Sequence, residues 1–218
     1  MDTNANVLAG LAAFAKDHFR HDTSGHDWWH VERVWKLAKR IALDEKADVF
    51  LVGAAALLHD VADYKFGGDG GTAGRALARQ WLMSLGVEES VVIQIETIID
   101  SVSFKGAGVD TTPASLEAMI VQDADRLDAI GAIGIARTFA FGGSRGRHMH
   151  DPDVRPINHE SFEAYKKSES TTINHFYEKL FLVKDRLNTK TAKGIGRKRH
   201  NYMARFLKEF HNEWDAKE

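Results

Sequence analysis

The sequence predicts an all-α protein, and three observations lead to this fold class. Apolar residues recur every three to four positions through most of the 218 residues, which is the spacing of one helix face. The alternating pattern of a half-buried strand is almost absent; VVIQIETII could form a short strand, but its length favours a helix. The three prolines, Pro113, Pro152 and Pro156, all fall in segments that we predict to be loops.

The predicted helices follow from this spacing in order. The first, Val7–Phe19, has an apolar stripe formed by Leu8, Leu11, Ala12 and Ala15. Trp29–Leu43 is amphipathic, and Val49–His59 is apolar nearly all round, as is typical of a buried helix. The remaining predicted helices span Gly74–Leu85, Glu88–Val102, Leu116–Arg126, Ala129–Phe141, Ser161–Leu187 and Thr191–Trp214.

Caps and loops separate these helices. Thr72 is the expected N-cap of Gly74–Leu85 and Gly86 its expected C-cap. Loops are predicted at Phe66–Gly71, Lys105–Pro113 and Gly142–Pro156. No internal repeat or linker divides the chain, so we expect a single domain over 1–218.

Composition narrows the function classes. The formal net charge of −2 gives no sign of nucleic acid as an obligate partner, and we interpret the basic segment KGIGRKRH as a solvated helix face. The chain has no cysteine, which excludes a disulfide framework or a thiolate metal site. The N-terminus lacks the pattern of a signal peptide, and no apolar run is long enough to span a bilayer. We therefore expect a cytoplasmic protein without membrane contact.

The pair His59-Asp60 is the feature with the clearest chemical meaning. It ends the alanine-rich run AAALLHDVADYK, where a polar group buried without a partner costs about 2–7 kcal/mol. A divalent metal would satisfy both side chains. Adjacent helical residues point about 100° apart, so two neighbouring ligands can share one ion most easily at a helix end. An alternative interpretation, in which these side chains form buried salt bridges with arginines and no metal binds, stays open.

Other polar side chains on apolar helices could complete such a site. They are His30 in the second predicted helix and Asp123, Asp125 and Asp128 in VQDADRLDAIGAIGIA. Imidazole and carboxylate ligands together suit manganese, iron, cobalt, nickel, zinc or magnesium. A lone helical histidine or an isolated HD dipeptide is only weak evidence for a metal site. The ordered set of all these residues on apolar helices is stronger evidence.

The order H…HD…D, with its first histidine in WWHVERVWKLAKRIA, resembles the HD-domain superfamily of metal-dependent phosphohydrolases. The likeness covers roughly Asp27–Arg137, the expected metal-binding core, and continues in NHFYEKLFLVKDRLNTKTAK within the C-terminal helices of 158–214. It implies an all-α HD-domain bundle in which His30, His59, Asp60 and Asp125 hold the metal. Asp123 is the alternative to Asp125. Dinuclear members of this superfamily carry additional histidines between the HD pair and the last aspartate. No histidine lies between Asp60 and His148 here, so the resemblance implies one ion rather than two, and we favour manganese.

The resemblance also suggests catalytic and substrate-binding residues. Asp63, four residues after His59, is our general-base candidate, and Arg33, one turn after His30, is our candidate for gripping phosphate. Lys65 follows the HD pair closely and is a candidate for phosphate binding.

Further substrate contacts are expected outside the metal-binding core. His175 and Lys179 share one face of HFYEKL, and Arg147 lies in the loop Gly142–Pro156; all three are candidates for substrate binding. Trp28, Trp29 and Tyr64 could stack on a base, although aromatic residues in helices more often belong to the core.

The function implied is hydrolysis of a phosphorylated small molecule. DADRLDAIGAIGIA resembles a bacterial subgroup that includes nucleotide pyrophosphohydrolases, so we expect cleavage of (deoxy)nucleoside triphosphates to monophosphate and pyrophosphate. The alternatives are a nucleoside monophosphate phosphatase, a cyclic phosphodiesterase, or a regulatory HD module that binds metal or nucleotide without turnover. The amphipathic C-terminal helix Thr191–Trp214 could pack on the core of its own chain or on a second copy, so a homodimer is one possibility.

Overall fold

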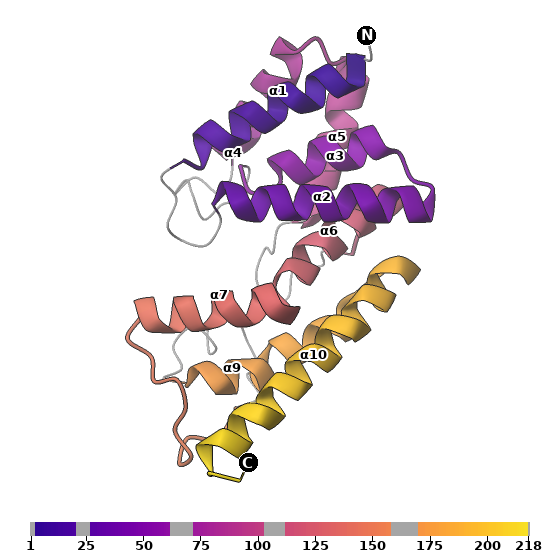
Figure 1. Ribbon diagram of the computed structural model, residues 1–218. Helices are drawn as coiled ribbons and strands as arrows, with labels where there is room; N and C mark the ends of the chain where they lie inside the picture. Colours follow the sequence, from indigo (N-terminus) through magenta and orange to yellow (C-terminus); the bar gives the residue numbers. More distant parts are fainter. Residues whose placement is uncertain (1–2, 21–26, 62–71, 103–111, 158–169, 218) are drawn as a thin grey trace. The chain divides into compact units, whose positions relative to one another are not determined.

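The computed structural model describes residues 3–20, 27–61, 72–102, 112–157 and 170–217 (Figure 1). These residues form helices and loops and contain no strand, which confirms the predicted all-α class. The helices are α1 (Thr3–His18), α2 (Trp28–Glu45), α3 (Val49–Leu58), α4 (Thr72–Ser84), α5 (Glu89–Val102), α6 (Leu116–Asp128), α7 (Gly131–Ser144), α9 (Thr172–Glu178), the 3-10 helix η1 (Leu180–Arg186) and α10 (Lys190–Trp214).

Most predicted helices are present with ends shifted by a few residues. Thr72 is the first residue of α4 rather than its N-cap. Gly86 has φ +76°, the left-handed conformation expected of a C-cap glycine. The loop predicted from Gly142 begins later, because α7 continues to Ser144. The loop Phe66–Gly71 and most of Lys105–Pro113 lie outside the described residues.

The prediction of one continuous helix over Ser161–Leu187 is wrong in its described part. Thr171 caps α9, with its side chain accepting a hydrogen bond from the backbone N–H of Asn174. Lys179 then leaves the helical conformation (φ −139°, ψ −56°), and the chain continues as the 3-10 helix η1. The apolar spacing persists across this break, which explains why the sequence pattern suggested a single helix.

The chain divides into an N-terminal unit, Met1–Asp125, and a C-terminal unit, Arg126–Glu218. In the N-terminal unit the apolar helix α3 packs against α1, α2 and α5, and its residues from Val52 to Leu58 are buried. In the C-terminal unit α10 packs against α7 and η1. The assignment of 1–218 to a single domain stays a prediction. Within the described residues no helix combines the length and hydropathy that a membrane crossing requires.

Candidate metal centre

His59 and Asp60 emerge from the end of α3. The helix ends at Leu58, His59 is its C-cap, and both polar side chains are buried, with 3% and 5% of their residue surface exposed. The second half of α3 consists of apolar residues that are buried in the core because burial removes them from water. The two residues that follow it are therefore carried into the interior, where they need partners.

His30 reaches the same place from α2. Asp27 is the N-cap of this helix, and its Oδ1 accepts a hydrogen bond from the backbone N–H of His30 at 2.9 Å. His30 is the third residue of α2 and is 1% exposed. Because α2 packs against α3, the imidazole of His30 lies beside that of His59, with ring centroids 5.5 Å apart.

Four side chains of the N-terminal unit converge at this point. His30 Nε2 lies 3.3 Å from Asp60 Oδ2 and 3.4 Å from Asp125 Oδ1. His59 Nε2 lies 3.4 Å from Asp60 Oδ1. One ligand atom from each of His30, His59 and Asp60 lies within 4.8 Å of the others. The cluster is therefore compact enough for a single ion.

The hydrogen bonding of His59 tests whether a metal fits these residues. Its Nδ1 is 2.7 Å from the carbonyl oxygen of Ala56, so Nδ1 carries the hydrogen and donates it. In the neutral ring Nε2 then presents a lone pair; it is buried, makes no hydrogen bond with a described residue, and faces the carboxylate of Asp60. Two acceptors cannot bond to each other. A proton on Nε2 or a metal cation between the two groups resolves the conflict, and metal-binding histidines are commonly oriented by such a carbonyl.

Asp125 is the aspartate of α6 whose carboxylate lies beside His30, at 3.4 Å, and its role as the fourth ligand stays a prediction. Burial raises the pKa of Asp125, but the hydrogen bond with His30 and the charges of His30 and His59 outweigh it and hold the pKa below its ordinary value. Asp123 is fully buried and lies two residues earlier on α6, about 200° away around the helix. The two carboxylates therefore cannot both face His30. Asp128 instead forms an ion pair with Arg137 at 2.7 Å.

Of the other residues predicted for this site, the structure describes only Arg33. Asp63, Tyr64 and Lys65 lie outside the described residues. Arg33 is half-buried on α2, one turn after His30.

In the C-terminal unit the fold brings Arg147, His175 and Lys179 together. Burial and the positive charges of Lys179 and Arg147 lower the pKa of His175 to about 3, so this imidazole is neutral at physiological pH. His175 therefore adds no positive charge of its own to that of Lys179 and Arg147. Its role in substrate binding stays a prediction.

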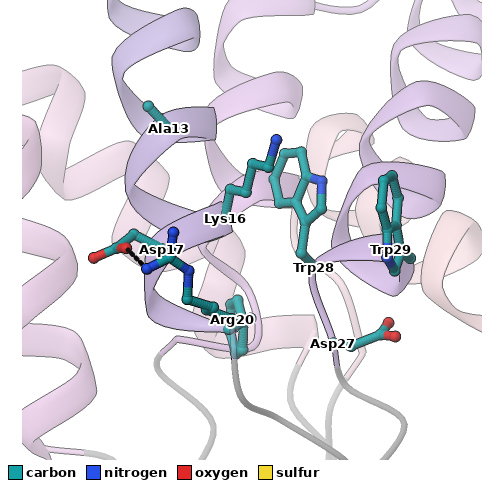
Figure 2. A pocket seen from close by; sticks show the side chains of 8 residues that line it. Ala13, Lys16, Asp17, Arg20, Asp27, Trp28 and Trp29 are labelled. Carbon is teal, nitrogen blue, oxygen red and sulfur yellow. Dashed lines mark ion pairs between the residues drawn. The ribbon is translucent and has the colours of Figure 1, made fainter.

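A shallow pocket of about 420 Å³ is lined in part by residues that directly precede His30 in the sequence (Figure 2). It is lined by Ala13, Lys16, Asp17, Phe19, Arg20, Asp27, Trp28 and Trp29. The sequence singled out the two tryptophans but not Lys16, Arg20 or Asp27. The pairing of the α1 end with the α2 start is a tertiary contact, for which the sequence holds no local signal.

Comparison with known proteins identifies the family of the chain. The HD domain family matches residues 28–130. The uncharacterized protein YpgQ of Bacillus subtilis (strain 168) is 38% identical over 193 residues, which cover 88% of this chain and 86% of YpgQ.

Two solved structures are similar over nearly the whole chain. An HD-superfamily hydrolase from Bacillus thuringiensis is 40% identical, with a TM-score of 0.79 and coverage of 98% of this chain and 99% of that one. The structure of Bacillus subtilis YpgQ in complex with ADP has a TM-score of 0.77, with 30% identity and coverage of 97% and 96%. The buried His/Asp cluster and these similarities together show that the chain belongs to the HD-domain superfamily of metal-dependent phosphohydrolases.

Proposed function

We propose that the protein hydrolyses nucleotides, and specifically (deoxy)nucleoside triphosphates to the monophosphate and pyrophosphate, with one manganese ion. The buried cluster of His30, His59, Asp60 and Asp125 carries this proposal, because it offers two imidazoles and two carboxylates to one cation. Two neutral imidazoles and two carboxylates also balance the charge of a divalent ion. The ADP in the structure of the relative YpgQ supports a nucleotide ligand.

When bound, a divalent ion supplies a Lewis acid that polarises a phosphoryl oxygen and lowers the pKa of the attacking water. The chain's own contribution is to fix the ligands in place. Ala56 holds the tautomer and orientation of His59, and the Asp27 cap fixes the backbone of His30 at the start of α2. Ligands that are already oriented lose little freedom when the ion binds, which favours tight and selective binding.

The proposed reaction breaks the anhydride between the α- and β-phosphorus atoms. The oxygen of water forms a bond to the α-phosphorus, and the bridging oxygen leaves with pyrophosphate. One proton of the water must be accepted, and Asp63 remains our candidate for that role. Arg33 is the candidate for compensating charge on the phosphoryl oxygens, because guanidinium groups bind phosphate through two parallel hydrogen bonds.

A single ion fits the distribution of possible ligands. In the part of the chain that the structure describes, His30, His59 and Asp60 form the one cluster of three or more such side chains compact enough for a metal. This arrangement agrees with the absence of any histidine between Asp60 and His148. The homodimer, the cytoplasmic location and the identity of the metal stay predictions.

A nucleotide panel tests the proposal. The purified protein is assayed with nucleoside mono-, di- and triphosphates and cyclic nucleotides in manganese, cobalt or magnesium, and phosphate and pyrophosphate are measured separately. We expect pyrophosphate from triphosphates in manganese. Asp60→Ala should abolish both turnover and bound metal by elemental analysis. The control Asp100→Ala removes an exposed aspartate that pairs with Arg75, and it should change neither.

The product identifies the correct alternative if the proposal fails. Release of phosphate alone from monophosphates would indicate a phosphatase, and turnover only of cyclic nucleotides would indicate a phosphodiesterase. Nucleotide binding without turnover of any phosphate compound would overturn the enzymatic proposal in favour of a regulatory module. Activity and metal content that both survive in Asp60→Ala would show that the site is misplaced.

A further inference from the structure

The pocket between the end of α1 and the start of α2 has an aromatic wall that the metal chemistry does not use. Figure 2 shows Lys16 on α1, Arg20 just beyond the end of α1, and Trp28 and Trp29 in the first turn of α2. Trp29 is 58% exposed, and its indole therefore remains in contact with water. A large aromatic side chain gains free energy when a ligand covers it. The volume of about 420 Å³ falls within the range of small-molecule pockets.

The position of the pocket ties it to the metal centre. Trp28 and Trp29 directly precede the metal ligand His30, so the pocket wall begins about 3 Å along the α2 axis from it. Trp28 points about 200° and Trp29 about 100° away from His30 around the helix. Of the two tryptophans that line the pocket, Trp29 is therefore the one whose direction around the helix is nearer to that of His30.

The charges of the pocket decide which part of a nucleotide it can take. Two cations, Lys16 and Arg20, are balanced by two carboxylates, Asp17 and Asp27, and Asp17 already faces Arg20 at 4.0 Å. Because the positive and negative charges on the rim of the pocket cancel, the rim attracts a negatively charged polyphosphate tail only weakly. It does offer both hydrogen-bond donors and acceptors beside an aromatic face, and the edge of a nucleobase also carries both.

We propose that this pocket binds the nucleobase of the nucleotide whose phosphates are hydrolysed at the metal centre, with the base stacked on Trp29. The proposal rests on the proposed function and specifies where its substrate binds. Asp27 links the two parts, because its Oδ1 caps α2 at the backbone N–H of His30 while its side chain lines the pocket. Lys16 and Arg20 provide donors for acceptor atoms on the edge of the base, such as the ring nitrogens of adenine.

Equilibrium binding of ADP and of inorganic pyrophosphate in manganese tests the proposal, because pyrophosphate has no base. The dissociation constant of each ligand is measured by calorimetry for the wild type, Trp29→Ala and Trp29→Phe. Loss of base stacking typically weakens binding by roughly 5- to 150-fold. We therefore expect the ratio of the ADP constant to the pyrophosphate constant to rise by that factor in Trp29→Ala. Trp29→Phe keeps an aromatic face and should retain most of the preference for ADP.

Trp214→Ala is the matched control, because Trp214 is also a partly exposed tryptophan (47%) and does not line the pocket. The ratio of the ADP constant to the pyrophosphate constant in Trp214→Ala should equal that of the wild type. An unchanged ratio in Trp29→Ala, or an equal rise in Trp214→Ala, would overturn the base site. Nucleotide turnover combined with an unchanged ratio would leave the proposed function intact and remove only the base site. A raised ratio in Trp29→Ala, in a protein that turns over no nucleotide, would support the base site and contradict the proposed function.

Discussion

Gly134, the fourth residue of α7, is a position where a single methyl group should be costly. A Cβ added there would lie 2.3 Å from the carbonyl oxygen of Ala129 and 2.6 Å from its carbonyl carbon. Both contacts are with backbone atoms, which cannot rotate away as a flexible side chain can. Gly134 therefore allows the chain to turn tightly from α6, which carries Asp125, into α7.

The size of the effect follows from the contact. The oxygen of Ala129 must move by at least about 0.7 Å to restore the 3.0 Å that real Cβ contacts respect. Forcing extra atoms into a packed region typically costs about 1–3 kcal/mol, whereas replacing glycine by alanine within a helix gains about 0.8–1 kcal/mol. Gly143→Ala provides the control, because it lies in the same helix and its Cβ would meet nothing within 4 Å.

Comparison of the two variants isolates the steric contribution. The helix-propensity gain is similar in both, so Gly134→Ala should be less stable than Gly143→Ala by about 1–3 kcal/mol, a difference in Tm of roughly 2–12 °C. Thermal unfolding followed by far-ultraviolet circular dichroism measures it. Equal melting temperatures for the two variants would refute the packing argument and show that the turn after α6 is not as tight as described.

Three further predictions concern the metal, pH and a helix cap. Manganese at 100 times its Kd should stabilise the wild type by about 2.7 kcal/mol, which raises Tm by roughly 5–11 °C; a similar rise in Asp60→Ala would count against the site. The pKa of His175 is about 3, below the ordinary 6.5, so the unfolded chain takes up the proton first as the pH falls. The free energy of unfolding should therefore drop by about 1 kcal/mol per pH unit below 6.5, a value discounted for the partial exposure of His175. Urea unfolding between pH 7 and 5.5 measures this slope, and His175→Gln should flatten it. Asp48 accepts hydrogen bonds from the backbone N–H groups of Phe50 and Leu51, so Asp48→Ala should cost about 0.5–2 kcal/mol in the same assay, while Asp44→Ala should cost little.

The sequence predicted the metal cluster better than it predicted the boundaries of the later helices. His59 and Asp60 were identifiable because two polar groups end an apolar helix, and that conflict is visible locally. The resemblance selected Asp125 with Asp123 as the alternative, and the position of Asp125 beside His30 depends on the packing of α6, which the sequence does not show. The break at Lys179 depends on a backbone conformation that apolar spacing does not record.

The connection between α2 and α3 explains why distant residues meet at the metal centre. Lys46 takes a left-handed conformation (φ 60°) and ends α2, and Asp48 caps α3 only two residues later. So short a connection makes the two helices antiparallel neighbours, and the start of α2 therefore lies at the same end of the pair as the end of α3. His30 and His59 are 29 positions apart in the sequence and are placed by the two helix ends, where the backbone of Asp27 to His30 and the carbonyl of Ala56 orient them. The cluster of His30, His59 and Asp60 is thus positioned by helix termini, which can direct adjacent side chains such as His59 and Asp60 to one point in a way that the middle of a helix cannot.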